Sequence, residues 1–465
     1  MKWHYSVLLP AVITGLALGS CKKAVEEKEL WKAVQAVAAP VSDAACLSGA
    51  IKGTMLSGKT YTVCGDIIIN VGDTLTVQEG VTIKFTGKYG IGVNGSFICL
   101  GTKDHPNWIT YDGAKKTDTY GYDPSLDSAY MGRWIGIIGG TTCPMMILKW
   151  THVEFAGIAV PKSSPIYPIS SKPYSIFFQN PAGIFVFEDS WLYGSTDDPF
   201  RILGGKIAVL RSTFEKCGYT GGEAMNAKAG TIGDFAYNLC IGMATNGPKL
   251  SNSGAAVGVP GSNVRMYNNT IVNCGFRRSA AGRGGSINFE EGAGGMAYNN
   301  LIVNCKFGLR VVQNPIADTA NLRYGYNWYY ADSGSVADNF IPNLAVSTCI
   351  SNAIPTDIPN PLSYLPAGWH PGDSYTAPLS LLGANDPQFI DGPVPMPEGL
   401  LLRDIAFVGK YNFALKPTSP CAGKGYTGFN PRKDVREDPV YGATEITLPG
   451  KDIGAYQVNG AGNHH

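Results

Sequence analysis

The stretch VRMYNNTIVNC at residues 264–274 returns as GMAYNNLIVNC at residues 295–305. The offset between the copies is 31 residues, because Tyr267 matches Tyr298. Each copy is a short apolar run broken by Asn, with strand-like rather than helical periodicity. Self-similarity at a period of this size indicates a chain wound into stacked coils. The pair therefore predicts an all-β chain that forms a parallel β-solenoid.

Strand-like segments of the same kind extend through most of the chain. Residues 46–112 are predicted to form the opening coils, with closely spaced strands separated by Gly, which tolerates the positive φ of tight corners. Residues 143–315 continue the coils, and their uneven spacing indicates loop excursions at 159–182 and 243–262. We therefore predict one β-helix body over residues 46–315.

The N-terminus predicts export and lipidation. Residues 1–20 resemble a bacterial signal peptide, with an apolar run too short to span a membrane. Leu18-Gly19-Ser20-Cys21 matches a lipobox, so we expect lipid on Cys21; a plain secretory signal with a chance cysteine is the alternative. Lys22 favours sorting to the outer membrane, on its surface or periplasmic side. Residues 21–45 would then be a lipidated tether.

Composition excludes some functions. The formal net charge is +1, so no global field attracts nucleic acid, and we expect no nucleic-acid partner. Charged residues make up only 16% of the chain and Gly is abundant at 58 residues, which favours strands and tight turns. The sequence has no CxxC pair and no His-rich cluster, so no metal site or cofactor is predicted. Calcium binding stays an open alternative, although the sequence contains no calcium-binding motif.

The cysteines and the repeated asparagines predict interior structure. Cys46 and Cys64 flank the first strands and could pair in an oxidising compartment. Cysteine packs as a small hydrophobe, so matching cysteines in successive coils are expected to be stacked interior thiols. Side-chain amides can bond to turn backbone, so some repeated asparagines are expected to form a ladder inside a corner. These residues are Cys217, Cys274 and Cys305, and Asn268, Asn269 and Asn273 with their copies Asn299, Asn300 and Asn304.

The last third of the chain differs from the coils. Pro becomes dense over residues 316–400 and the repeats disappear, so this segment is expected to wrap the solenoid as loops. SPCAGKG at 419–425 and DIGAY at 452–456 resemble the closing segment of many secreted parallel β-helix proteins, where it is a structural cap. Open sheet ends invite association. We therefore expect residues 316–465 to form wrapping loops and a C-terminal cap.

Four segments carry a wider resemblance: GDIIINVGDTLTVQEGVTIKF at 65–85, GSFICLGTKDHPNWITYDG at 95–113, GRWIGIIGG at 132–140 and LKWTHVEFAGIAV at 148–160. In order and spacing they resemble a family of Gram-negative surface lipoproteins, which are right-handed parallel β-helix proteins of mostly unassigned function. The resemblance implies a right-handed, single-stranded solenoid with three sheets, of the pectin lyase-like kind. It carries no known catalytic residue onto this chain.

Enzymes of this fold that cleave polysaccharides need a carboxylate pair, or a basic residue that is often aided by calcium. Equivalent residues of adjacent coils lie about 4.8 Å apart, so the acids and arginines of residues 197–310 could form one face. A hydrogen-bonded turn at Asp197-Asp198 and a surface salt-bridge network are the structural alternatives. The catalytic candidates, all weak, are Asp197, Asp198, Glu223, Arg283, Glu290 and Glu291.

Arginine suits bidentate contact with a carboxylate, which favours an acidic sugar as the ligand. Trp328 and Tyr329 could stack on sugar rings, or could pack their segment onto the solenoid. His152 lies in a strand and is expected to be a core or face residue, and no Ser-His-Asp order is present. The binding candidates are Arg201, Arg277, Arg278, Arg310, Trp328 and Tyr329.

Fold alone does not set function, so three hypotheses stay open. The leading one is an envelope-anchored module that binds a polysaccharide or another surface partner. The second is a polysaccharide lyase or glycoside hydrolase acting on an acidic glycan. The third is a non-catalytic component of an outer-membrane assembly. We expect either a monomer or a member of an envelope complex.

Overall fold

The computed structural model describes residues 39–116, 125, 127–278, 280, 282–312, 315–340, 363–368, 376–392 and 411–465. The predicted signal peptide, the lipidation site Cys21 and the tether as far as residue 38 lie outside these ranges. Within them, no helix is both long and apolar enough to cross a membrane. The described part is nearly all-β, as predicted.

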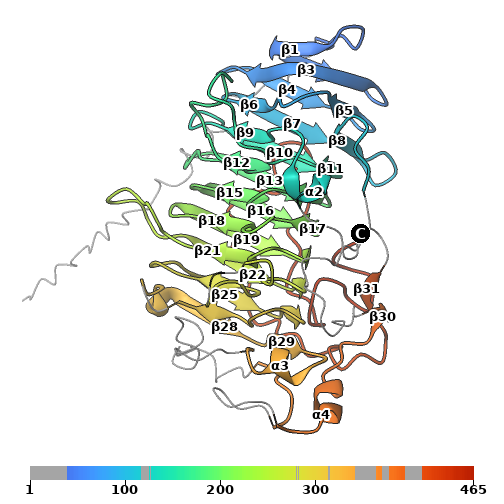
Figure 1. Cartoon of the computed structure of the whole chain (residues 1–465), viewed down its shortest axis with the longest axis vertical. Helices are drawn as coiled ribbons and strands as arrows, with labels where there is room; N and C mark the ends of the chain where they lie inside the picture. The colour runs from blue at the N-terminus through green and yellow to red at the C-terminus, as the bar shows by residue number, and fades with distance from the viewer. Residues whose placement is uncertain are drawn as a thin grey trace, which may run out of the picture. The chain divides into compact units, whose positions relative to one another are not determined.

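Ten strands form one continuous parallel sheet, which we call sheet A (Figure 1). Each of these strands pairs with the equivalent strand of the next coil. Parallel pairing of this kind requires the chain to leave each strand and return one level further along, which is how stacked coils are built. The strands are β2 (Gly53–Met55), β4 (Thr74–Val77), β7 (Ser96–Leu100), β10 (Met145–Lys149), β13 (Ile184–Glu188), β16 (Gly205–Leu210), β19 (Thr231–Ala236), β22 (Asn263–Tyr267), β25 (Gly294–Tyr298) and β28 (Leu322–Gly325).

The second sheet has 19 strands and consists of two series that meet in the long strand β3 (Thr60–Ile69). The first half of β3 pairs with β5 and the second half with β6. Series B continues through β5 (Thr82–Phe85), β8 (Asn107–Tyr111), β11 (Thr151–Glu154), β14 (Trp191–Ser195), β17 (Thr213–Cys217), β20 (Leu239–Ile241), β23 (Thr270–Val272), β26 (Leu301–Val303) and β29 (Trp328–Tyr330). Series C comprises β1 (Leu47–Ala50), β6 (Ile91–Val93), β9 (Ile137–Gly139), β12 (Ile176–Phe178), β15 (Phe200–Ile202), β18 (Glu223–Ala227), β21 (Asn246–Leu250), β24 (Asn288–Phe289) and β27 (Arg310–Val311).

The two copies of the repeat stack on each other. Tyr267 lies opposite Tyr298 in sheet A, and Ile271 lies opposite Ile302 in series B. The predicted parallel coils are therefore confirmed. The coils also extend beyond the predicted boundary at residue 315, because β28 and β29 form one more coil after the short 3₁₀ helix η2 (Thr319–Asn321). Tyr324, Trp328, Tyr329 and Tyr330 are strand residues of this coil and Tyr326 is its corner residue, so none of them belongs to a wrapping loop.

The cysteine predictions hold with one correction. Cys46 and Cys64 form a disulfide. Cys274 and Cys305 are buried free thiols on adjacent coils, as predicted. Cys217 is also a buried free thiol, but it is not in the coil next to Cys274. Strand β17 pairs with β20, and β20 in turn pairs with β23, so one coil lies between Cys217 and Cys274. Met243 holds the equivalent position in that coil.

A ladder of buried polar side chains runs through the corner between sheet A and series B. Each rung follows a residue with positive φ, such as Asn268 (φ 50°) before Asn269. Asn300 Oδ1 accepts a hydrogen bond from the backbone N–H of Asn269 at 3.1 Å, and its Nδ2 donates to the carbonyl of Met266 at 3.0 Å. The predicted ladder is confirmed and is longer than predicted. Its members include Ser190, Ser212, Asn238, Asn269, Asn300 and Asn327.

The segment after the last coil closes part of the stack. Helix α3 (Gly334–Ala337), Phe340 and Leu382 of helix α4 (Leu379–Gly383) join the interior core. The antiparallel strands β30 (Phe389–Asp391) and β31 (Asn412–Leu415) place Phe389 and Phe413 in the apolar cluster on the outer face of series B. The described parts of the Pro-rich region therefore cover the solenoid, as expected for wrapping loops.

The predicted C-terminal cap lies elsewhere. Residues 426–465, here called the C-terminal strap, run along the corner between sheet A and series B rather than across the end of the stack. The strap bonds to Asn299 through Tyr426, to Asp234 through the backbone of Arg432, and to Lys149 through the carbonyl of Asp438. Asn299 is a corner residue with positive φ, whereas Lys149 and Asp234 lie in strands of sheet A, so the strap finds its partners on both the corner and the adjoining sheet.

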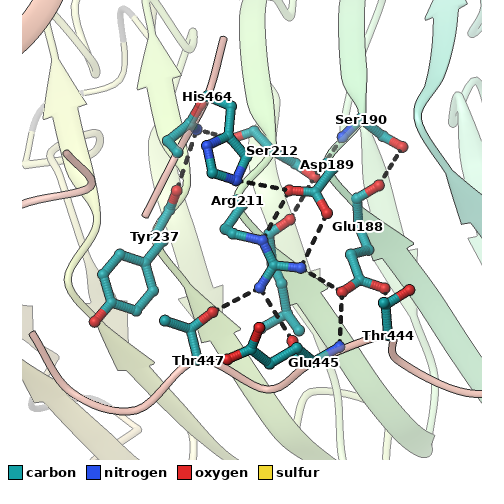
Figure 2. A network of polar contacts seen from close by, with 12 residues as sticks. Glu188, Asp189, Ser190, Arg211, Ser212, Tyr237, Thr444, Glu445, Thr447 and His464 are labelled. Carbon is teal, nitrogen blue, oxygen red and sulfur yellow. Dashed lines mark hydrogen bonds and ion pairs between the residues drawn. The ribbon is translucent and has the colours of Figure 1, made fainter. Parts of the chain in front are cut away.

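Figure 2 shows the densest of these contacts, a buried charged network around Arg211. The Arg211 guanidinium bonds to both oxygens of Asp189, to Glu188, and to the strap at the Glu445 carbonyl (3.0 Å). Glu188 in turn accepts a hydrogen bond from the backbone N–H of Thr444 at 2.7 Å. Although burial disfavours the cation, Asp189 and Glu188 raise the pKa of Arg211. The network therefore keeps its charges while it holds the strap.

We predict that Asn269→Ala lowers the free energy of unfolding in urea by about 1–3 kcal/mol, because the buried N–H of Asn238 loses its acceptor. Asn269→Ser should cost clearly less, since Ser212 performs the same role in an earlier coil. Equal losses for the two variants would contradict the ladder as the reason.

Replacing Arg211 with Met should cost about 3–5 kcal/mol, because Glu188 and Asp189 stay buried without their cation. The strap should also become sensitive to limited proteolysis. Lys433→Met is the matched control, because the Lys433–Glu437 pair is 45% and 44% exposed and such a pair contributes about 0–1 kcal/mol. A strap that stays protected in the Arg211 variant would show that other contacts hold it.

Candidate functional site

Predicted acids and arginines converge on the outer face of series C. Five consecutive strands place one polar residue each in register, and the next residue of each strand belongs to the core, so the polar side chains point outward. We call this row, with the acids beside it, the polar face of series C. The row consists of Arg201, Asn226, Lys249, Asn288 and Arg310.

Asp198 and Glu223 form a hydrogen-bonded carboxyl pair on adjacent coils. The backbone N–H of Glu223 also donates to Asp198 Oδ1 at 3.0 Å, and Arg201 Nε donates to Asp198 Oδ2 at 2.8 Å. Burial, and then the charge of Glu223, raise the pKa of Asp198 well above its usual value. Burial also opposes ionisation of Glu223, but Lys249 and the bond from Asp198 lower its pKa. The surroundings therefore favour protonation of Asp198 and ionisation of Glu223.

Asp197 lies in the bend between β14 and β15. The bend removes the strand alternation that would have sent Asp197 and Asp198 to opposite faces. Burial, and then the nearby Glu223, raise the pKa of Asp197. Three predicted acids therefore interact at one end of the polar face.

Lys249 links these acids to the next coil. Its Nζ lies 3.1 Å from Glu223 Oε1 and 3.4 Å from Glu290 Oε1, and Asn288 donates to Glu290 at 2.8 Å. Burial disfavours the cation, but Glu223 and Glu290 outweigh it and raise the pKa of Lys249. Lys249 is therefore a fixed positive charge and is unsuited to act as a base.

The remaining predicted arginines divide into two groups. Arg310 is buried and donates to the Gly284 carbonyl at 3.0 Å, so it ties Gly284 to the polar face. Arg278 and Arg283 precede Gly284 in the chain and are half-buried. Arg277 lies outside the face, since its Nε donates to the Gly218 carbonyl at 2.8 Å and its guanidinium lies 4.6 Å from the ring of Tyr130 in α2 (Ser128–Met131).

Three other candidates do not present a binding surface. Glu291 lies in the turn after β24 and accepts a hydrogen bond from Ser251 at 2.5 Å. Trp328 packs in the cluster outside series B and donates from Nε1 to the Asn385 carbonyl. Tyr329 lies in the interior core. The two rings therefore pack the last coil, which was the structural alternative given for them.

A cleft of about 390 Å³ opens beside Arg201. Its walls come from β12, β15 and the predicted excursion after residue 159, with Tyr167, Tyr174 and Phe177 among the rings. The guanidinium of Arg201 lies 4.7 Å from the ring of Tyr174. Lys172 and Arg201 supply positive charge, and no carboxylate lines the cleft within the described ranges.

Lys228 directly follows β18, two residues after Asn226 of the row, and it was missed by the sequence analysis. Its Nζ lies 3.0 Å from Ser251 Oγ. Burial, and then the nearby cations Lys249 and Arg201, lower the pKa of Lys228 to about 8. A lysine with such a pKa can exchange a proton near neutral pH, as a general base must.

Tyr174, Asn226 and Lys249 were also missed. Their signal in the sequence is weak, because the coils differ in length and outward positions cannot be aligned without the strand register. Searches of protein-family models, curated proteins and solved structures find nothing that matches this chain. The part of the chain that the structure describes holds no group of three or more His, Cys, Asp or Glu side chains that could bind a metal.

Lys228→Met tests the electrostatics of the polar face. The pKa of Lys228 is about 8 in the folded protein against 10.5 for the ordinary side chain. Between pH 8 and 10.5 the unfolded chain therefore binds more protons at this group than the folded protein does. In that range Lys228 makes the free energy of unfolding rise with pH. Below pH 8 the buried charge of Lys228 lowers the free energy of unfolding by a constant amount. We predict that the variant is more stable at pH 7 by roughly 1–3 kcal/mol.

The measurement is urea unfolding of both proteins at a series of pH values from 7 to about 10.5. The advantage of the variant should shrink as pH rises. Lys88→Met, at an exposed lysine, is the control and should show no pH-dependent difference from the wild type. Parallel curves for wild type and Lys228→Met would reject the lowered pKa.

Proposed function

We propose that this protein is a lipid-anchored envelope protein, attached to the outer membrane through Cys21, that binds an acidic polysaccharide. In this proposal the solenoid is a right-handed parallel β-helix with three sheets, as in the family it resembles. In this proposal the glycan is held in the cleft beside Arg201, at one end of the polar face of series C.

The charge of the cleft carries this proposal. Arg201 and Lys172 are positive, and the described cleft lining has no carboxylate to oppose an anion. Nε and Nη2 of Arg201 contact Asp198, and the other N–H groups of the guanidinium can donate to a ligand. Tyr167, which is half-buried, adds ring surface of the kind that packs against a sugar. This combination suits the carboxylate and the apolar face of a uronic acid.

A hydrolase is the second candidate, and the Asp198–Glu223 pair favours it. A pair of carboxyl groups with pKa values shifted in opposite directions resembles the acid and the carboxylate of a glycosidase, although in such enzymes the two groups lie about 5 Å or more apart. Asp198, however, is fully buried and lies behind Arg201. A ligand in the cleft would contact Arg201 before the acids, so the geometry supports binding more strongly than turnover.

We predict that the protein is retained on an immobilised acidic polysaccharide such as polygalacturonate or alginate, and not on a neutral one such as dextran. Arg201→Gln should weaken retention about tenfold or more, since a charge-assisted hydrogen bond contributes about 1.5–3 kcal/mol. Lys172→Gln, at an exposed residue that does not endanger folding, should weaken it less and reduce its salt dependence. Arg133→Gln, at an exposed arginine outside the cleft, is the control.

The same incubations separate the hypotheses. Release of unsaturated products or new reducing ends by the wild type, but not by the Asp198→Asn variant, would show that the protein is an enzyme. That result would overturn the binding proposal. Absence of retention on every acidic polysaccharide would reject glycan binding in favour of a role within an assembly. Equal losses for Arg201→Gln and Arg133→Gln would reject the cleft as the contact.

A further inference from the structure

Arg201 contacts the cleft on one side and a buried acid on the other. Its side chain is 20% exposed and lines the cleft, while Nε and Nη2 lie 2.8 and 2.6 Å from Asp198 Oδ2. The side chain of Asp198 has no exposed surface, and its other oxygen accepts a hydrogen bond from the backbone N–H of Glu223. The cation that would attract an anionic ligand is therefore in direct contact with an acid that the ligand cannot reach.

The charge of Asp198 decides how much of the Arg201 charge acts on the cleft. An ionised Asp198 neutralises the guanidinium in an ion pair, whereas a protonated Asp198 leaves the positive charge uncompensated at that contact. Charges at hydrogen-bond distance and away from water interact far more strongly than the same charges at the surface. A ligand anion and an ionised Asp198 therefore compete for one cation. Because such coupling is reciprocal, an anion in the cleft favours the protonated form of Asp198.

Both acids and bases surround Asp198. Asp197 and Glu223 lie beside it, and burial followed by the charge of Glu223 raises the pKa of Asp198 well above its usual value. Lys249 faces Glu223 from the next coil at 3.1 Å, and Arg278 faces Asp197. Asp198 therefore loses its proton at a higher pH than an ordinary aspartic acid, in a range where an acidic glycan is already fully ionised.

Two other titratable groups lie near Arg201. Burial raises the pKa of Tyr174 to about 12, so this phenol stays neutral. Lys228 differs, because burial and the nearby cations Lys249 and Arg201 lower its pKa to about 8. Its loss of positive charge would also weaken the attraction for an anion as the pH rises. Any pH dependence of binding must therefore be divided between Asp198 and Lys228.

We propose that anion binding in the Arg201 cleft is linked to a proton on Asp198, so that the affinity for an acidic glycan falls when Asp198 loses that proton. The inference rests on the glycan site proposed above and adds the regulation of that site. The proton comes from solvent when the ligand binds and returns to solvent when the ligand leaves. The contact between Arg201 and Asp198 produces the coupling, and the proton affinity of Asp198 sets only the pH range in which the coupling is observed.

The test is isothermal titration calorimetry of the full chain with oligogalacturonate from about pH 5.5 to about pH 9. Ordinary carboxyl groups titrate near pH 4, so the ligand keeps a constant charge over this range. We expect the affinity to fall at least tenfold towards the upper end, with a slope of at most tenfold per pH unit because one proton is linked. Titrations in two buffers with different ionisation enthalpies should show net uptake of up to one proton.

Asp198→Asn is the decisive variant, because an amide can donate to Glu223 and accept from Arg201 without carrying a charge. Its affinity should stay close to that of the wild type at pH 5.5 and should change less than threefold over the series. Lys228→Met should keep the pH dependence and the proton uptake of the wild type. Asp104→Asn, at an exposed acid outside the cleft, is the control and should match the wild type at every pH.

Thermal melts and far-UV circular dichroism establish that the variants fold. If Asp198→Asn does not fold, the proton uptake decides: uptake in both the wild type and Lys228→Met supports the linkage to Asp198, and its absence from either overturns it. A pH dependence that persists in folded Asp198→Asn would also overturn it.

Two results for the wild type separate this inference from the proposed function. Binding with the same affinity at every pH would overturn the proton linkage and leave the glycan site standing. Absence of binding at every pH would reject the glycan site itself, and the linkage with it.

Discussion

The stacking of the coils depends on how the backbone N–H groups at the corner between sheet A and series B find hydrogen-bond acceptors. A residue with positive φ turns the chain there, and the next backbone N–H points along the stack instead of into a sheet. Asn269, Asn300 and their equivalents supply the missing acceptor from the following coil, and the amide groups bond back to carbonyls one strand away. A buried N–H without a partner costs about 1–3 kcal/mol. The side-chain ladder therefore decides that successive coils meet in one register.

The inward-pointing side chains of every strand form the core. The outward-pointing side chains can therefore differ in chemistry from one sheet to another and from coil to coil. The outer face of series C is apolar near β9 and β12, where the excursion after residue 159 packs on Ile138 and Phe177. It becomes charged from Arg201 onward. The outer face of series B is aromatic at Trp108 and Trp191, and apolar from Leu239 onward, where β30 and β31 cover it. One scaffold can thus carry outer faces of different chemistry.

The sequence predicted the parts that repeat. Identical spacing in 264–274 and 295–305 was sufficient for strand pairing, for the stacked thiols Cys274 and Cys305, and for the ladder at Asn269. One of the alternatives drawn from the sequence was a shared face for the acids and arginines of residues 197–310, and the structure brings Asp198, Glu223 and Arg201 of that set together. It did not reveal Lys249 or Lys228, because loops of unequal length hide which outward residues are neighbours. Nor did it place the strap, since that position depends on contacts such as Arg211 with Glu445 across more than 200 residues.

The two buried charged clusters differ in a way that bears on their roles. Around Arg211, burial disfavours the cation, but Asp189 and Glu188 raise the pKa of the guanidinium. This cluster joins two parts of the chain. On the polar face, burial and Glu223 raise the pKa of Asp198, and burial and the nearby cations lower the pKa of Lys228 to about 8. Perturbed pKa values of this kind gather at functional sites. The polar face, rather than the Arg211 network, is therefore where binding or chemistry is expected.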